Sequence, residues 1–131
     1  MILVDTGAWF ASLVASDQNH AAAMRWLRQN REPLLTTDYV IDETLTLLRA
    51  KGKRIQSEEF GQLLFSGQLA TIYYLTPEDI EQTWSVFRRD GDKDWSFTDG
   101  SSKVVTELFD VRTVFTFDHH FRQFGHVQVV P

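Results

Sequence analysis

The sequence predicts an α/β protein, a three-layer α/β/α sandwich with a central, mostly parallel sheet. Short apolar runs with β-branched residues alternate with longer segments of helical periodicity along the whole chain. Helical segments separate the successive strands, and parallel strands need such crossover connections. The chain has 131 residues, 43% of them hydrophobic, which suffices for one substantial core. We therefore expect a single domain over residues 1–131.

The first half of the chain supplies two predicted strands and four predicted helices. The strands are apolar runs that stop at polar residues, and polar breaks with capping residues separate the helices. Gly52 ends the third helix because glycine readily adopts the left-handed conformation found after helices. In order, these elements are a strand at Met1–Val4, helices at Ala8–Val14 and His20–Asn30, a strand at Leu34–Thr37, and helices at Tyr39–Lys51 and Ser57–Phe65.

The second half of the chain alternates predicted strands and helices in the same way. Thr76 followed by Pro77 is a strong helix start, with threonine as the cap and proline at the first helical position. Ser96 and Asp99 fit a capping box at the start of the next helix. The expected elements are a strand at Ala70–Leu75, helices at Pro77–Arg89 and Phe97–Leu108, and strands at Thr113–Phe117 and Val127–Val130.

The composition restricts the possible sites. The chain has no cysteine and 4 histidines, so a metal site must use carboxylates, waters or histidines, which favours Mg²⁺ or Mn²⁺. The net charge of −5 argues against a general basic surface for nucleic acid, although bound divalent ions would offset it locally. No apolar run approaches the ~20 residues that span a bilayer, and no signal segment is evident. We therefore expect a soluble, cytoplasmic protein without membrane contact.

Four acidic residues follow apolar runs, flank an apolar helix face or lie at the start of a helix. Asp5 and Asp118 each come directly after a predicted strand, and Glu43 lies beside the apolar face of its helix. Asp99 lies in the first turn of a helix. In parallel sheets, sites form outside the carboxyl ends of the strands, so these acids could converge there. Alternatively, Asp5 and Asp118 are ordinary helix caps, and Asp99 belongs only to its capping box.

Converging carboxylates would repel one another strongly without a cation, because like charges a few ångströms apart cannot all ionise cheaply. One or two Mg²⁺ or Mn²⁺ ions would resolve this repulsion. Two ions ~3.5–4 Å apart could clamp the attacking and leaving oxygens of a phosphodiester and activate a bound water.

These residues resemble the PIN domain family, and within it the VapC-type toxins of bacterial toxin–antitoxin pairs. The resemblance covers the whole chain. Its motifs are Val4-Asp5-Thr6-Gly7-Ala8-Trp9, Ile41-Asp42-Glu43-Thr44, Trp95-Ser96-Phe97-Thr98-Asp99 and Phe115-Thr116-Phe117-Asp118-His119-His120-Phe121.

The resemblance implies roles for particular residues. Asp5, Glu43 and Asp99 would form a metal-binding triad, with Asp118 as the fourth catalytic acid. Asp94 matches a further acid, which the resemblance places at the outside of the metal site. Candidates for orienting a ligand or water are Thr6, Thr98 and Ser96.

Other side chains allow two interpretations. Arg49, Lys51, Lys53 and Arg54 could contact the RNA backbone or simply stabilise the C-terminal end of their helix. His119 and His120 are adjacent, so we expect exposure or helix-start packing rather than joint metal ligation. Most aromatic residues are expected in the core, whereas Trp9 and Trp95 are candidates near the site.

The resemblance implies a Mg²⁺- or Mn²⁺-dependent endoribonuclease that hydrolyses RNA phosphodiesters, inhibited by a cognate antitoxin and assembled as a homodimer. One alternative is a PIN-fold RNA-processing nuclease outside a toxin system. A second is a non-catalytic PIN-like binding module, although all four acids are present. A different α/β phosphate hydrolase is less compatible, because Asp5 lacks a second aspartate two residues later.

Overall fold

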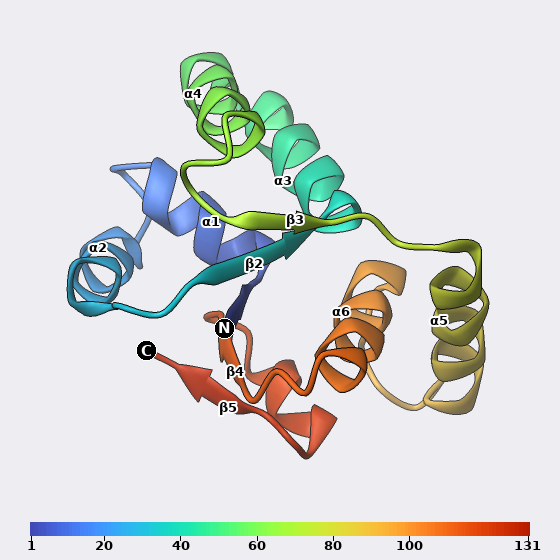
Figure 1. Ribbon diagram of the computed structural model, residues 1–131. Coiled ribbons are helices and arrows are strands. Elements are labelled where there is room, and N and C mark those ends of the chain that lie inside the picture. The colour runs from blue at the N-terminus through green and yellow to red at the C-terminus, as the bar shows by residue number, and fades with distance from the viewer.

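The computed structural model describes residues Met1 to Pro131, and the helices and strands alternate as the sequence predicts (Figure 1). The helix His119–Phe124 is a 3₁₀ helix, named η1. In chain order the elements are β1 (Ile2–Val4), α1 (Thr6–Leu13), α2 (His20–Gln29), β2 (Leu34–Thr37), α3 (Asp38–Ala50), α4 (Arg54–Phe65), β3 (Thr71–Tyr73), α5 (Pro77–Arg89), α6 (Phe97–Leu108), β4 (Thr113–Phe115), η1, and β5 (Gln128–Val130).

The five strands form one sheet in the order β3-β2-β1-β4-β5. All four neighbouring pairs are parallel, and Ile2 of β1 lies in register with Leu34 of β2 and Thr113 of β4. The predicted mostly parallel sheet is therefore confirmed, and the sheet is parallel throughout.

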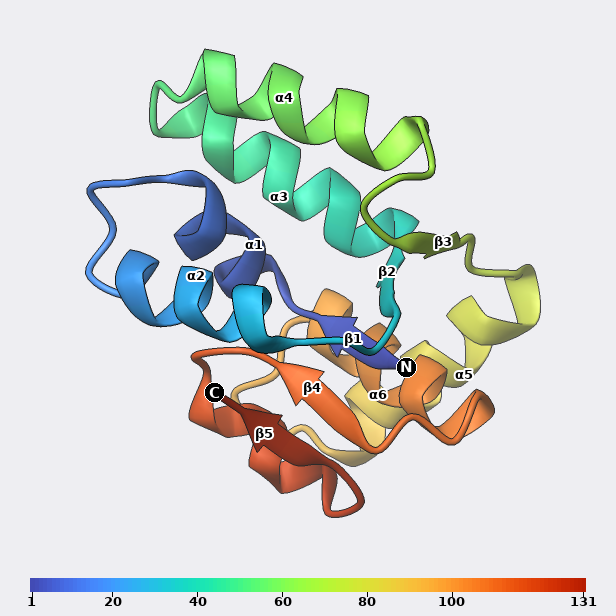
Figure 2. The ribbon, with the colours of Figure 1, turned by 60° about the vertical axis from the view of Figure 1, so that its left-hand side comes forward.

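Two hydrophobic clusters cover the two faces of the sheet. Ile2 and Val4 of β1 pack with α1 to α4, whereas Leu3 packs with α5, α6 and η1. This division follows from the alternation of side chains along a strand. Figures 1 and 2 show α1 to α4 on one side of the strands and α5 and α6 on the other. The predicted three-layer α/β/α sandwich is confirmed.

The sheet order reverses direction beside β1. The chain runs outward from β1 to β2 and β3, and then returns to place β4 and β5 on the other side of β1. In such sheets a crevice opens at the carboxyl ends of the strands where the order reverses. The residues directly after β1 and β4 are therefore brought together.

Several predicted boundaries differ from the structure. Helix α4 begins at Arg54 rather than Ser57, and the Ser57 hydroxyl donates to the Arg54 carbonyl oxygen at 2.7 Å instead of capping the helix. Strand β4 ends at Phe115, because the chain turns at Thr116 toward η1, which the sequence did not predict. Strand β3 is also shorter than predicted.

None of the helices combines the length and apolar character needed to cross a bilayer.

Candidate active site

An open cleft of about 440 Å³ lies at the carboxyl edge of the sheet, beside the ends of β1 and β4. It receives residues from α1, α3, the start of α6 and the segment after β4. Four of the predicted acids line this one cleft. The lining residues are Asp5, Thr6, Gly7, Phe10, Asp17, Asn19, Glu43, Leu47, Ser96, Asp99, Phe117 and Asp118.

Asp5 is the most deeply buried of these acids, with 7% of its surface exposed. It occupies the N-cap position of α1, but its side chain makes no capping hydrogen bond. Instead Oδ2 accepts a hydrogen bond from the Thr116 hydroxyl at 2.9 Å. Burial, reinforced by the charges of Asp99 and Glu43, raises the pKa of Asp5 to about 7, although the Thr116 hydrogen bond opposes this increase.

Asp99 starts α6 as part of the predicted capping box. Its Oδ2 accepts a hydrogen bond from the Ser96 backbone N–H at 3.0 Å, while the Ser96 hydroxyl accepts from the Asp99 N–H at 3.0 Å. Burial and the neighbouring carboxylates of Glu43 and Asp118 raise the pKa of Asp99. Asp99 therefore caps its helix and faces other acids at the same time.

Glu43 and Asp118 enter the cleft from different elements. Glu43 lies on the half-buried flank of α3, as the helical pattern predicts. Asp118 caps η1, and its Oδ1 accepts from the His120 backbone N–H at 2.9 Å and lies 2.9 Å from His120 Nδ1. Asp118 is thus the N-cap that the alternative interpretation requires, and it also borders the cleft.

The acids share the cleft without forming a closed ligand cluster. No group of three or more His, Asp or Glu side chains is close enough to hold a metal ion as the side chains stand. Asp5, Asp99 and Asp118 each use one carboxylate oxygen in a hydrogen bond within the protein. The second oxygen of each carboxylate is then the one left for a ligand.

The chemistry of the lining residues fits a hard divalent cation. Carboxylate oxygens are the donors that Mg²⁺ and Mn²⁺ favour. Burial, together with the neighbouring acids, raises the pKa of Asp5 and of Asp99, and a bound cation would offset both effects. The buried Thr6 hydroxyl also has no hydrogen-bond partner. A buried hydroxyl without a partner is costly, so a water or carboxylate beside it would supply the missing hydrogen bond.

Several predicted site residues lie outside the cleft lining. The Asp94 side chain is 88% exposed, with Oδ2 3.9 Å from His120 Nε2. Thr98 borders an adjacent hollow that shares Glu43 with the cleft. The basic residues lie at the junction of α3 and α4, where Arg54 Nε pairs with Glu58 Oε1 at 3.3 Å. This basic set comprises Arg49, Lys51, Lys53 and Arg54, and none of its members lines the cleft.

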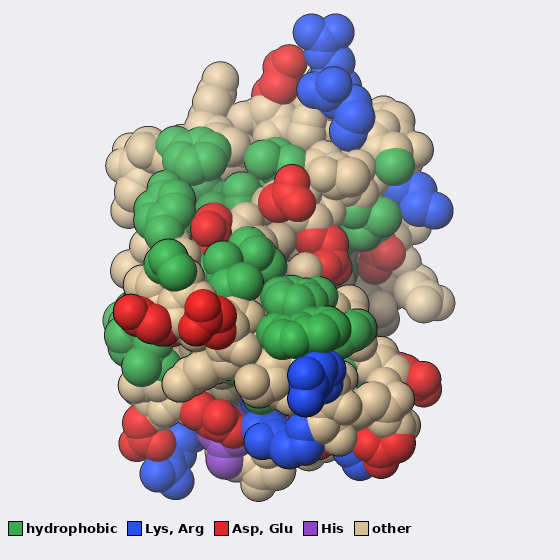
Figure 3. Space-filling model, turned by 90° about the vertical axis from the view of Figure 1, so that its right-hand side faces the viewer, with side chains coloured by type: hydrophobic (Ala, Val, Ile, Leu, Met, Phe, Trp, Pro, Cys, Tyr) green, Lys and Arg blue, Asp and Glu red, His purple; other side chains and the backbone are tan.

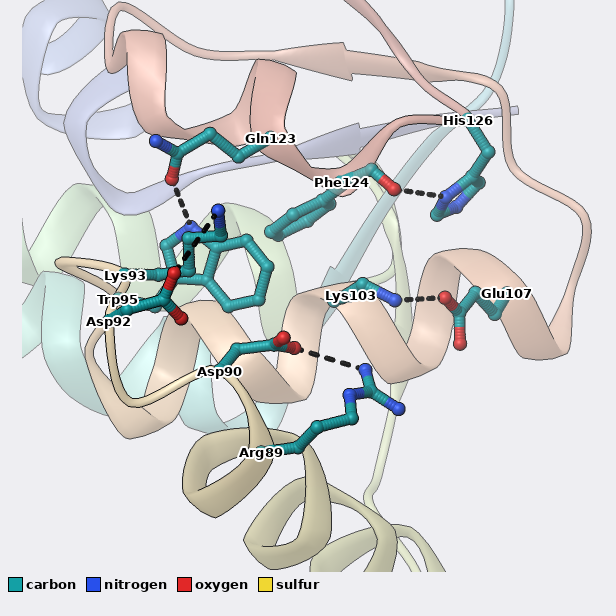
Figure 4. Close-up of polar contacts among 10 residues, drawn as sticks. All are labelled: Arg89, Asp90, Asp92, Lys93, Trp95, Lys103, Glu107, Gln123, Phe124 and His126. Atoms are coloured by element: carbon teal, nitrogen blue, oxygen red, sulfur yellow. Dashed lines mark hydrogen bonds and ion pairs between the residues drawn. The ribbon is translucent and has the colours of Figure 1, made fainter.

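The two tryptophans expected near the site belong to the core. Trp9 is buried, and its indole N–H donates to Thr36 Oγ1 at 3.3 Å. Trp95 is buried on the other face of the sheet, where its N–H donates to Gln123 Oε1 at 3.1 Å (Figure 4). Both indole N–H groups are satisfied internally, and neither ring lines the cleft.

The structure adds residues that the sequence reasoning missed. Asp17 and Asn19, from the loop between α1 and α2, line the cleft, and Asp17 Oδ2 accepts from the Asn19 N–H at 2.9 Å. The sequence predicts only a helix break in this loop. The sequence predicts Thr116 to be a strand residue. A threonine hydroxyl can accept a hydrogen bond from the backbone N–H two residues later, and Thr116 does so with Asp118.

A parallel α/β sheet with four acids at its reversal point agrees with the resemblance to the PIN domain family. Residues 2–127 match the PIN domain family, so the chain belongs to this family.

The most informative relatives are VapC proteins. The chain is 28% identical over 131 residues to the 23S rRNA-specific endonuclease VapC20 of Mycobacterium tuberculosis, covering 100% of this chain and 99% of that protein. It is 30% identical to a VapC ribonuclease of Archaeoglobus fulgidus, covering 91% and 78% respectively. The crystal structure of M. tuberculosis VapC20, described as a sarcin-ricin loop cleaving toxin, superimposes with a TM-score of 0.92 at 27% identity over the whole of both chains.

Proposed function

We propose that this chain is a metal-dependent endoribonuclease that hydrolyses RNA phosphodiester bonds, acting as one PIN domain over residues 1–131. The observation that carries the proposal is the meeting of Asp5, Glu43, Asp99 and Asp118 in one cleft. The raised pKa values of Asp5 and Asp99 support it, because neighbouring acids contribute to both. The relatives named as ribonucleases support the choice of substrate and reaction.

In this proposal the four acids hold Mg²⁺ or Mn²⁺ through their carboxylate oxygens, with Asp94 outside them. When bound, the ion supplies positive charge for the phosphate and lowers the pKa of the attacking water. Thr6 orients a carboxylate or water through its unpartnered hydroxyl. Ser96 keeps Asp99 in place at the start of α6. Thr98 stays a candidate for the same orienting role from the adjacent hollow.

The first RNA to test is 23S ribosomal RNA. This choice follows the name of the M. tuberculosis relative, which matches the chain along its whole length. Transfer RNA and messenger RNA serve as comparison substrates. The proposal also places the protein in the cytoplasm, where these RNAs are found.

We further propose that the chain is the toxin of a type II toxin–antitoxin pair. An antitoxin could place a short helix beside the acidic cleft and insert a basic side chain among its carboxylates. The test is growth arrest on expression, relieved by co-expression of the small gene next to it. Cleavage without growth arrest would favour an RNA-processing nuclease.

A homodimer is the expected assembly, and the face formed by α5 and α6 is our candidate interface. Hydrophobic side chains gather over this face, with acidic side chains between them (Figure 3). Trp84 and Phe87 are 51% and 38% exposed, and their rings stack at 6.3 Å. The Arg88 guanidinium lies 5.8 Å from the Trp84 ring. Exposed aromatic residues beside arginine are typical of protein interfaces.

The decisive experiment measures RNA cleavage with Mg²⁺ or Mn²⁺, with and without EDTA. We expect chelation, Asp5→Asn and Asp99→Asn each to abolish cleavage. Asp110→Asn is the matched control, because Asp110 is exposed and pairs only with Arg112. Cleavage that survives both chelation and the two cleft substitutions would exclude this mechanism. RNA binding without any cleavage by the wild type would favour a binding module.

A further inference from the structure

Thr116 links two of the cleft acids through a single hydroxyl group. It follows β4 directly and is 1% exposed. Its Oγ1 lies 2.9 Å from Asp5 Oδ2 and 2.9 Å from the backbone nitrogen of Asp118. Asp5 and Asp118 lie near opposite ends of the chain, and no other side chain forms hydrogen bonds to both of them.

The direction of the Thr116 hydroxyl is determined by its two partners. A backbone N–H can only donate, so Oγ1 must accept the hydrogen bond from Asp118. The hydroxyl proton is then free to point at the carboxylate of Asp5, which accepts it. Hydrogen bonds to a charged acceptor are among the strongest in proteins. Both bonds are therefore made at once by one group in a single orientation.

The backbone reinforces this linkage from the same strand end. The Asp5 N–H donates to the Phe115 carbonyl oxygen at 3.0 Å, and the Thr116 N–H donates to the Val130 carbonyl oxygen at 3.0 Å. Thr116 is thus held between Val130 of β5 and Asp5, which follows β1. The Thr116 hydroxyl donates to Oδ2 of Asp5, so Oδ1 of this cleft-lining carboxylate is the oxygen available for a ligand.

We infer that Thr116 is a positioning residue, which sets Asp5 and Asp118 relative to each other so that both present an oxygen to the same ion. This inference rests on the proposed metal-dependent function. It assigns Thr116 no contact with substrate or ion. Side chains that hydrogen-bond to metal ligands typically change metal affinity by roughly 10–100-fold when removed.

The test compares Thr116→Val, which keeps the shape and loses both hydrogen bonds, with Thr116→Ser, which keeps the hydroxyl. Thr83→Val is the control, because Thr83 is equally buried and its hydroxyl donates only to the Asp79 carbonyl oxygen at 2.7 Å. Mn²⁺ affinity is measured by calorimetry on the full chain without RNA. Urea unfolding of each variant reports the loss of stability separately.

We expect Thr116→Val to weaken Mn²⁺ binding by roughly 10–100-fold, and Thr116→Ser to restore it to within about threefold of the wild type. Thr83→Val should lower the urea midpoint without changing Mn²⁺ affinity. Wild-type affinity in Thr116→Val, or equal losses in Thr116→Ser and Thr116→Val, would overturn the inference and leave the proposed function standing. A wild-type chain that binds no Mn²⁺ would refute both the inference and the proposed metal-dependent function.

Discussion

Asp99 shows how one side chain can serve the fold and the site together. One oxygen of its carboxylate belongs to the capping box, while its charge faces Glu43 and Asp118. Capping needs an acceptor oxygen, whereas metal ligation and mutual repulsion depend on the negative charge. The two roles can therefore be separated by a substitution that removes only the charge.

The variant Asp99→Asn should retain the helix cap and lose metal binding at the cleft. Its side-chain carbonyl can still accept the Ser96 N–H, so we expect the free energy of unfolding to fall by less than about 0.5 kcal/mol. Cleavage should be abolished under single-turnover conditions, because Asp99 would contact the ion directly. Ser96→Ala, in contrast, should cost about 1 kcal/mol of stability. Wild-type cleavage by Asp99→Asn would leave Asp99 with a capping role alone.

Asp5 makes the stability of the metal-free protein depend on pH. Its pKa is about 7 when folded and near 3.8 when unfolded, so between these values the folded state binds more protons than the unfolded state. Stability must therefore fall as the pH rises from about 4 to 7, by up to about 4 kcal/mol from this group. The raised pKa of Asp99 acts in the same direction, and the lowered pKa of Asp79 acts in the opposite one.

Urea unfolding of wild type and Asp5→Asn, in EDTA across this pH range, measures the effect. The amide of the variant cannot titrate, so the difference in stability between the variant and the wild type should grow in favour of the variant as the pH rises. Added Mn²⁺ should remove this advantage by stabilising the wild type alone. A constant difference at all pH values would show that Asp5 has an ordinary pKa.

At the scale of the elements, the junction of α3 and α4 concentrates positive charge on an acidic protein. Lys51 and Lys53 flank the turn at Gly52 and form no ion pair, whereas Arg54 pairs with Glu58. The end of a helix favours cations, which accounts for part of this arrangement. Phosphate contact would add a dependence on salt that helix stabilisation does not produce.

The double variant Lys51→Ala/Lys53→Ala should bind RNA more weakly. The slope of log affinity against log salt concentration should become shallower by about 0.7 for each phosphate of a single strand that these lysines neutralise in the wild type. Binding is measured with an Asp5→Asn background to prevent cleavage. Arg25→Ala/Arg28→Ala, on α2, is the control of equal charge. An equal decrease in both double variants would indicate a general charge effect instead of a direct contact.

At the scale of the whole molecule, the exposed aromatic face of α5 and α6 bears on assembly. Trp84→Glu places a charge among the exposed aromatic residues of the proposed interface and should convert a dimer to a monomer, because charged residues are disfavoured in interface cores. Phe65→Glu is the control, since Phe65 is also exposed but lies at the end of α4. Molar mass from light scattering distinguishes the outcomes. A wild-type monomer, or a dimer in Trp84→Glu, would rule out this interface.

Most of the fold could be predicted from local patterns. Most helices and strands are close to their predicted ranges because caps, glycines and apolar periodicity are encoded in neighbouring residues. The predicted cap at Thr76 and the predicted capping box at Ser96 are confirmed. The start of α4 and the helix η1 are not predicted. The Ser57 hydroxyl donates to the Arg54 carbonyl oxygen, and the Thr116 hydroxyl accepts from the Asp118 N–H to form a turn. The residue types alone do not show that these hydroxyls make such bonds.

The α/β class, the site motifs that contain the four acids and the family resemblance can all be read from the amino-acid sequence. The meeting of these acids in one cleft cannot, since it depends on β4 returning beside β1. The same holds for the burial of Trp9 and Trp95 in the core, the place of Asp17 in the cleft and the hydrogen bond from Thr116 to Asp5. Helix caps and periodicity act over a few residues, whereas burial and side-chain pairing join segments that are far apart in the chain.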